Sequence, residues 1–154
     1  MEISRRLDYA LRMLCEVARE RDGSVVSVRK VAEASDIPYS FARTIQHELV
    51  RCGLLDTARG PRGGMSLAVD SRTTTLLDVV ERIEGPVCAL GEEGSSSDDF
   101  AELGKLWRGL KTQADRYLSS VTIYQLAIEG LVPVVPENLS FALAASASPE
   151  TVSE

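Results

Sequence analysis

The sequence predicts a mainly α-helical protein that carries one small β-hairpin and ends in a long helix. Apolar residues recur at three- and four-residue steps along several segments of the 154-residue chain, which is typical of amphipathic helices. Between two of these segments, two short apolar runs flank a glycine-rich basic turn, which indicates a hairpin. Hydrophobic residues make up 44% of the chain but aromatic residues only 5%, so we expect a mainly aliphatic core.

The first predicted helix runs from Ile3 to Glu20. Ser4 is its candidate N-cap, and Asp22-Gly23 ends it. The apolar positions with helical spacing are Ile3, Leu7, Ala10, Leu11, Leu14 and Ala18. After a short strand or loop around Val25 and Val26, a second helix is expected over Val28–Ser35, with Ser27 as its cap.

The third predicted helix runs from Pro38 to Cys52. Pro38 disfavours helix at Ile37 but suits the first turn of the helix that follows. We expect Phe41, Ile45 and Leu49 to form its buried stripe, and Gly53 to end it with a left-handed cap.

The hairpin is expected over residues 54–69. Its strands are residues 54–58 and 65–69, joined by the turn Arg59-Gly60-Pro61-Arg62-Gly63-Gly64. Two helices joined by a short turn and followed by a basic hairpin make up the layout of a winged helix-turn-helix. We therefore assign residues 1–85 to a winged helix-turn-helix DNA-binding domain, which includes a fourth helix over Thr75–Glu84.

The second half of the chain is predicted to hold a long helix between two irregular segments. Residues 86–99 are polar and acidic and are expected to form a flexible loop. Residues 100–128 form the expected dimerisation region, with the long helix over Phe100–Ser119 and a last short helix or turn over Thr122–Ile128. Residues 129–154, rich in Pro, Ser and Ala, are expected to be a weakly ordered tail.

The charge distribution restricts where an anionic partner could bind. The chain carries a net charge of −6, yet residues 1–72 hold 12 Lys and Arg against 10 Asp and Glu, whereas residues 73–154 hold 5 against 13. Any phosphate-binding face must therefore lie in the first half. Its positive charge comes almost entirely from arginine, which suits contacts with phosphates and guanine edges.

Several classes of protein are disfavoured by what the sequence lacks. No apolar run reaches the roughly 18–20 residues of a membrane helix, and the N-terminus lacks a signal-peptide pattern, so we expect a cytoplasmic protein without a membrane partner. Cys15, Cys52 and Cys88 form no CxxC motif, so neither a metal site nor a disulfide framework is indicated. Paired carboxylate, nucleophile-elbow and phosphate-loop motifs are missing, so we do not expect an enzyme.

The candidate DNA contacts lie on the third helix and on the hairpin. On the helix they are Tyr39, Ser40, Arg43 and Thr44, near the end that reads base edges in such folds. Arg43 can pair with guanine, whereas the hydroxyl groups can bond bases or phosphates. On the hairpin they are Arg59, Gly60 and Arg62, placed to enter the minor groove or to pair with phosphates. The alternative is a solvated helix face beside an ordinary glycine-rich turn.

A homodimer is expected because one recognition helix covers about half of a specific site, and a two-fold dimer reads a pseudo-palindrome. The candidate interface follows alternating four- and three-residue steps along the long helix: Leu103, Trp107, Leu110, Ala114 and Tyr117. The alternative is that this helix packs back on its own domain.

Several motifs together resemble the Rrf2 family of bacterial transcription repressors. The most specific are the Arg59–Gly64 turn with Leu67-Ala68, Leu77-Asp78-Val79-Val80 with Glu84-Gly85-Pro86, and Leu106-Trp107. The likeness covers about residues 1–128. It implies a dimer that binds operator DNA, with the long helix crossing to the partner subunit and with DNA contacts at Ser40, Arg43, Thr44, Arg59 and Gly60.

One departure from the family pattern bears on its cofactor. The resemblance implies that members sensing through an iron–sulfur cluster carry three cysteines between the fourth helix and the long helix, and this chain has only Cys88 there. One thiolate cannot hold a cluster that usually needs about four protein ligands. We therefore expect a cluster-free repressor that responds to a small molecule or a partner protein. The alternatives are a redox sensor acting through the Cys88 thiol and a protein-interaction module that does not bind DNA.

Overall fold

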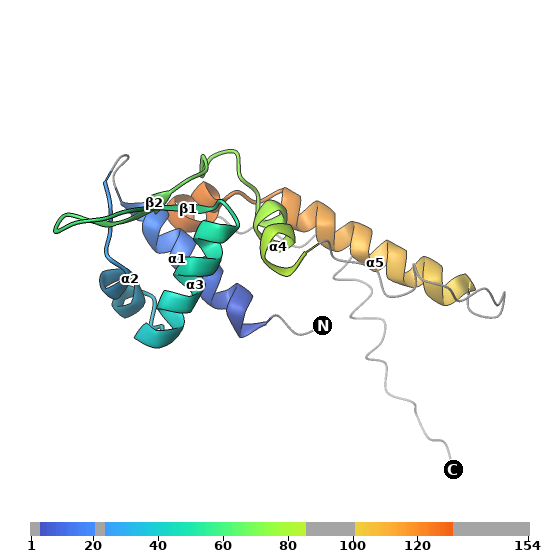
Figure 1. Ribbon diagram of the computed structural model, residues 1–154. Coiled ribbons are helices and arrows are strands. Elements are labelled where there is room, and N and C mark those ends of the chain that lie inside the picture. The colour runs from blue at the N-terminus through green and yellow to red at the C-terminus, as the bar shows by residue number, and fades with distance from the viewer. Residues whose placement is uncertain (1–3, 21–23, 86–100, 131–154) are drawn as a thin grey trace, which may run out of the picture.

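The computed structural model describes residues 4–20, 24–85 and 101–130, which fold into helices, one hairpin and a short π-helix (Figure 1). The elements are α1 (Arg5–Arg19), α2 (Val28–Ala34), α3 (Tyr39–Arg51), β1 (Leu55–Ala58), β2 (Gly64–Leu67), α4 (Leu76–Glu84), α5 (Ala101–Ser119) and η2 (Gln125–Glu129). The expected loop over residues 86–99, with Cys88, and nearly all of the expected tail lie outside the described residues. No helix in the described ranges is long and apolar enough to span a bilayer.

Helix α1 lies at the centre of the fold. Ser4 is its N-cap, as predicted, because its hydroxyl accepts a hydrogen bond from the Leu7 amide at 3.1 Å. The helix contacts α2, α3, β2, α4 and η2, so it buries more of its circumference than a surface helix does. Its buried side chains are Leu7, Ala10, Met13, Leu14 and Val17. The expected stripe was therefore incomplete, because Met13 and Val17 are buried whereas Leu11 and Ala18 are only partly so.

Helices α2 and α3 meet at a sharp turn through Asp36 and Ile37. Ser27 caps α2 by accepting a hydrogen bond from the Lys30 amide, as expected. Asp36 has a φ of 54°, a left-handed conformation that aspartate tolerates better than most residues. The Ile37 amide then donates to the Ala32 carbonyl at 2.9 Å, and the Ile37 side chain is buried. This turn fixes the direction in which α3 leaves α2.

The buried stripe of α3 differs from the prediction. Ala42, Ile45 and Leu49 are buried, whereas Phe41 is 57% exposed, so its assignment to the core was wrong. Ala42 takes the buried position that was expected for Phe41, because its small side chain allows the first turn of α3 to pack closely against the core. Phe41 lies on the flank of the helix instead, with its ring centroid 6.1 Å from that of Tyr9.

The hairpin is antiparallel, with Leu55 opposite Leu67 and Ala58 opposite Gly64. Val26 adds a single bridge to Met65 through two backbone hydrogen bonds of 2.9 and 2.8 Å. A side chain at Gly64 would place its Cβ 2.7 Å from the Val26 carbonyl oxygen. Glycine at this position therefore lets the backbone before α2 lie against the hairpin.

Helix α4 begins with a capping box. The Thr75 hydroxyl accepts from the Asp78 amide, and the Asp78 carboxylate accepts from the Thr75 amide at 2.8 Å and from its hydroxyl at 2.7 Å. These hydrogen bonds, led by the one from the hydroxyl, lower the pKa of Asp78. The helix buries Val79, Val80 and Ile83 in the core.

Helix α5 contacts α4 and otherwise runs away from the rest of the fold (Figure 1). The chain after it returns to the core, where Val121 and Ile123 are buried and Thr122 bridges to Thr75. The expected short last helix is a π-helix in its second part, and the Ala127 carbonyl there accepts a hydrogen bond from Arg19 on α1 at 3.0 Å.

Candidate nucleic-acid interface

The outward face of α3 carries the four helix residues predicted to contact DNA. Tyr39, Ser40, Arg43 and Thr44 are all exposed, and His47 follows on the same face one turn later. They lie opposite the buried stripe of Ala42, Ile45 and Leu49, so their positions follow from the packing of the helix. One hydroxyl is already engaged, since that of Thr44 donates to the Ser40 carbonyl at 3.2 Å.

The tip of the hairpin presents Arg59, Gly60 and Arg62 to solvent. A hydrogen bond of 2.9 Å from the Gly63 amide to the Gly60 carbonyl closes the turn. Pro61 occupies the second position of this turn, which its fixed φ favours. Gly60 has a φ of 112°, which side-chain-bearing residues rarely adopt. The turn therefore presents both arginines to solvent from one short, hydrogen-bonded loop.

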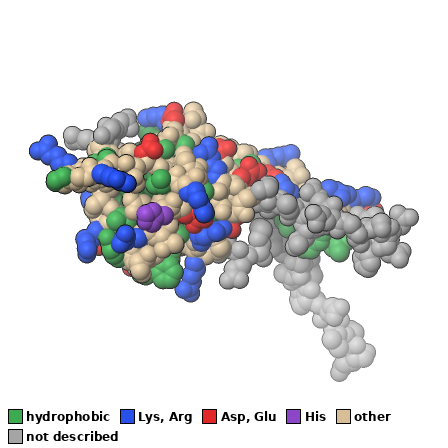
Figure 2. Space-filling view, in the orientation of Figure 1, with side chains coloured by type: hydrophobic (Ala, Val, Ile, Leu, Met, Phe, Trp, Pro, Cys, Tyr) green, Lys and Arg blue, Asp and Glu red, His purple; other side chains and the backbone are tan. Residues whose placement is uncertain are grey.

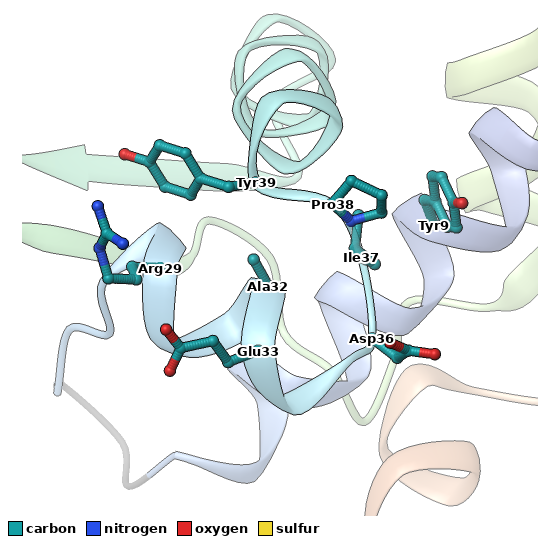
Figure 3. A pocket seen from close by; sticks show the side chains of 8 residues that line it. All are labelled: Tyr9, Arg29, Ala32, Glu33, Asp36, Ile37, Pro38 and Tyr39. Atoms are coloured by element: carbon teal, nitrogen blue, oxygen red, sulfur yellow. The ribbon is translucent and has the colours of Figure 1, made fainter.

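Helix α2 adds a residue that the sequence reasoning missed. The Arg29 guanidinium stacks on the Tyr39 ring, with its central carbon 4.8 Å from the ring centroid (Figure 3). The signal was present in the sequence, because Val31 and Ala32 were expected to face inward and Arg29 lies outside that stripe. Only the fold shows that this outward face of α2 adjoins the start of α3.

These elements lie at one end of the molecule. Figure 1 shows the hairpin projecting beyond the same end as α2 and the first turn of α3. In Figure 2, Lys and Arg side chains cover the hairpin tip and surround the single histidine on α3, whereas the acidic side chains visible in that view lie mainly toward α4 and the upper edge. The basic half of the sequence thus provides a basic surface despite the net charge of −6.

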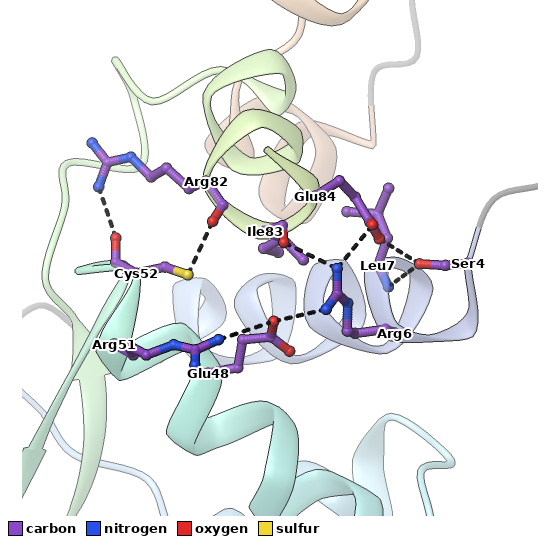
Figure 4. Close-up of polar contacts among 9 residues, drawn as sticks. All are labelled: Ser4, Arg6, Leu7, Glu48, Arg51, Cys52, Arg82, Ile83 and Glu84. Carbon is purple, nitrogen blue, oxygen red and sulfur yellow. Dashed lines mark hydrogen bonds and ion pairs between the residues drawn. The ribbon is translucent and has the colours of Figure 1, made fainter. Parts of the chain in front are cut away.

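An ion-pair network joins the inward side of α3 to α1 and α4 (Figure 4). Arg6 on α1 pairs with Glu48 on α3 at 3.3 Å and with Glu84 at the end of α4 at 2.8 Å. The Ser4 hydroxyl donates to Glu84 at 2.5 Å. This hydrogen bond, followed by the contribution of Arg6, lowers the pKa of Glu84. The acid on α3 is therefore directed inward and paired, which leaves the outward face basic.

A second set of contacts joins the end of α3 to α4. The Cys52 thiol donates to the Arg82 carbonyl at 3.1 Å, and the Arg82 guanidinium donates back to the Cys52 carbonyl at 3.3 Å. Arg82 also reaches the Gly53 carbonyl at 3.4 Å, so one side chain covers the carboxyl end of the recognition helix. Cys52 therefore helps to join the end of α3 to α4.

The predicted dimer residues divide into two groups along α5. Leu103, Trp107 and Leu110 are exposed by 45%, 38% and 43%, whereas Ala114 and Tyr117 are partly buried nearer α4. Leu106, which was not among the predicted interface residues, is the most exposed apolar side chain of this helix at 62%. Within the described part of the chain, the first half of α5 therefore does not pack back on its own domain.

The described residues do not provide a ligand set for an iron–sulfur cluster or another metal. No group of three or more His, Cys, Asp or Glu side chains among them is arranged to hold an ion. Burial raises the pKa of the Cys15 thiol, which disfavours the thiolate that a metal requires. The Cys52 thiol donates its hydrogen bond to the Arg82 carbonyl. Cys88, the redox candidate, lies outside the described residues.

Comparison with known proteins places the chain among bacterial regulators. Residues 3–129 match the Rrf2 family, described as "Iron-dependent Transcriptional regulator". A protein of Aquifex aeolicus named "Putative HTH-type transcriptional regulator" is 31% identical over 132 residues, which cover 82% of this chain and 91% of that protein. The regulator IscR of Photorhabdus laumondii is 26% identical over 129 residues, covering 82% and 79% of the two chains.

Solved structures share the fold. CymR, the global cysteine regulator of B. subtilis, superposes with a TM-score of 0.67 at 22% identity, covering 82% of this chain and 96% of that one. IscR of T. potens gives a TM-score of 0.67 at 21% identity, covering 97% and 93%. The predicted fold class, a mainly α-helical winged helix-turn-helix with a hairpin wing and a long C-terminal helix, is confirmed.

Proposed function

The chain belongs to the Rrf2 family of transcriptional regulators, and on that premise we propose that it is a homodimeric repressor that binds a pseudo-palindromic operator without an iron–sulfur cluster. The observation that carries this proposal is the group of exposed residues on the outward face of α3, next to a hairpin tip with two exposed arginines. In such a fold, the helix enters the major groove and the hairpin follows the backbone into the minor groove.

The DNA contacts follow from the chemistry of these side chains. Arg43 presents a planar set of donors that matches the acceptors of guanine. Ser40 and Thr44 flank it with hydroxyl groups that can bond bases or phosphates. At the hairpin, Arg59 and Arg62 extend from an exposed turn and can enter the minor groove or pair with phosphates.

Dimerisation is proposed through the exposed apolar side chains of α5. Leu103, Leu106, Trp107 and Leu110 lie within eight residues of one helix. Such a continuous apolar surface is costly to leave in water and is typical of an interface. A second copy of the helix is the natural partner, because a two-fold dimer would then present two recognition helices to one operator.

The absence of a cluster is part of the proposal. The chain has three cysteines, and two of them lie on α1 and at the end of α3. Because a cluster usually needs about four protein ligands, Cys88 alone in one subunit is insufficient. The absorption spectrum of anaerobically purified protein tests this point, since a sulfide-to-iron charge-transfer band in the visible range would contradict it. We expect the protein to act in the cytoplasm, where a bacterial regulator meets the chromosome.

The DNA-binding proposal is tested by replacing Arg43 or Arg59 with alanine. Duplexes selected from a random library by the wild-type protein provide the operator, and fluorescence anisotropy gives the dissociation constant. Loss of a bidentate base contact costs about 1–3 kcal/mol, so Arg43→Ala should weaken operator binding by tenfold or more and relax specificity at one position. Arg59→Ala should weaken binding without a change in the mass of the dimer.

Arg116→Ala is the matched control, since it removes an exposed arginine from α5, away from the proposed contacts. Unchanged affinity in both Arg43→Ala and Arg59→Ala would contradict the proposed interface. If the wild-type protein showed no salt-dependent binding to any duplex, the chain would instead be a winged-helix module for protein interactions.

A further inference from the structure

The stack of Arg29 on Tyr39 joins the two helices of the helix-turn-helix on their exposed side. Arg29 is the second residue of α2 and Tyr39 the first of α3, and both side chains are exposed. Among the residues that the structure describes, no carboxylate lies within ion-pair distance of Arg29, whereas its neighbour Lys30 pairs with Glu20 at 2.5 Å. Within residues 4–20, 24–85 and 101–130, the guanidinium of Arg29 is thus positioned by an aromatic ring and has no anionic partner.

We propose that Arg29 and Tyr39 form a single phosphate-binding unit that extends the DNA interface from α3 onto α2. The inference rests on the proposed DNA-binding function and adds a contact that does not read sequence. In helix-turn-helix proteins the first helix crosses the DNA backbone, so its outward residues meet phosphates and not base edges. Arg29 is placed on that helix, beside the end of α3 that enters the groove.

The stacking geometry leaves the donors of both side chains available. A guanidinium that stacks on an aromatic ring uses its face, while its N–H groups point outward in its own plane. The Tyr39 hydroxyl lies at the end of the ring and can donate to the same anion. Because the ring restricts the guanidinium before DNA arrives, less conformational entropy is lost on binding.

Two acids restrict where the phosphate can lie. Glu33 and Asp36 line the same pocket as Arg29 and Tyr39, a hollow of about 480 Å³. Figure 3 shows the guanidinium and the phenolic hydroxyl at one end of this hollow and Asp36 at the other. A phosphate inside the hollow would be repelled by the carboxylates, so the unit binds it at the outer edge, where a duplex lying across α2 and α3 would place its backbone.

The test measures how binding depends on salt. Each lost phosphate contact reduces the slope of log K against log salt concentration by about 0.9. Arg29→Ala is expected to reduce this slope by about that amount per bound subunit and to weaken binding by about tenfold. The loss should be equal on the selected operator and on a duplex of mixed sequence, because the contact is to the backbone. Tyr39→Phe should lose less affinity than Arg29→Ala. Arg29→Lys should keep the slope but lose affinity, because the charge remains without the stack.

Lys30→Ala is the matched control, since it removes the same charge from the next residue of the same helix. Its slope should stay closer to that of the wild type because Lys30 is paired with Glu20. An equal slope for Arg29→Ala and Lys30→Ala, with both variants folded by circular dichroism, would overturn the phosphate-binding unit. A loss of affinity for Arg29→Ala that is confined to the selected operator would also overturn this proposal. Failure of the wild-type protein to bind either duplex would instead reject the proposed function itself.

Discussion

A few single residues connect α3 to α1 and α4. Arg6 reaches from α1 to Glu48 on α3 and to Glu84 on α4, and Ser4 completes the network at Glu84 (Figure 4). The sequence predicted Ser4 as a cap because capping depends on neighbouring residues alone. It could not predict that the same hydroxyl also donates to Glu84, since that contact depends on how α1 and α4 pack.

The network gives the fold a specific pH dependence. The Ser4 and Arg6 contacts lower the pKa of Glu84 below its ordinary value of 4.5 in the folded state. A lowered pKa contributes stability that is present above the unfolded value and is lost as pH falls through the folded one. We therefore expect Glu84→Gln to lower the free energy of unfolding at neutral pH by up to about 1 kcal/mol, since the group is largely exposed.

Urea unfolding of both proteins as a function of pH measures this difference, which should shrink as pH falls below 4.5. Glu81→Gln serves as the control, because it removes an exposed carboxylate from the same helix that has no ion-pair partner among the described residues. A difference between wild type and Glu84→Gln that is constant with pH would show that the carboxylate charge contributes nothing.

The failed assignment of Phe41 shows the limit of periodicity. Phe41, Ile45 and Leu49 fit a helical stripe, but so do Ala42, Ile45 and Leu49, and the two sets differ by one residue at their start. The sequence favours the first set, because a large apolar side chain such as that of Phe41 is usually buried. The structure selects the second because a small residue permits close packing, a preference that only the neighbouring helices reveal.

At the scale of elements, the hairpin was predictable because its turn chemistry is local. The strands and the turn are placed within one residue or two of the expected positions. By contrast, the bridge from Val26 to Met65 joins segments almost forty residues apart in the sequence, and it places the Val26 backbone where a Cβ at Gly64 would lie. The π-helix after α5 was not predicted either, since its wide turn has no distinct pattern of residues.

The bridge predicts a large effect of a small substitution. In Gly64→Ala the added Cβ would lie 2.7 Å from the oxygen and 2.8 Å from the carbon of the Val26 carbonyl, both of them backbone atoms. Relief requires the hairpin to move away from the segment before α2, at a cost of about 1–3 kcal/mol. Denaturant unfolding should show this loss, together with weaker DNA binding from a displaced hairpin.

Gly109→Ala on α5 is the control for this substitution. Its added Cβ meets nothing within 4 Å, so the variant should be as stable as the wild type or more so, because alanine favours helix over glycine. Equal stability of Gly64→Ala and the wild type would mean that the hairpin is not held by the Val26 bridge.

For the whole molecule, the division of charge along the sequence was the most informative global signal. It restricts any phosphate-binding surface to the first half of the chain, where the structure places α2, α3 and the hairpin at one end (Figure 1). The sequence could not show that Arg29 joins this surface, because its proximity to Tyr39 depends on the turn at Asp36. The heptad-like spacing of α5 and the family resemblance both favoured a helix that projects from the domain, but the sequence left open that this helix packs back on its own domain.

The projection of α5 from the domain leads to the prediction on which the proposed two-fold dimer depends. Trp107 is 38% exposed on α5, beside the exposed Leu103, Leu106 and Leu110, so its removal leaves the core of the subunit intact. Tryptophan at the centre of an interface typically contributes 2 kcal/mol or more, so Trp107→Ala should weaken the dimer by about thirtyfold. Light scattering over a concentration series should then show monomers where the wild type is still dimeric, and operator affinity should fall because each monomer reads only a half-site. Thr112→Ala, an exposed position on the same helix outside the apolar group, should leave both unchanged. If Trp107→Ala and the wild type had the same mass at every concentration, α5 could not be the dimer interface.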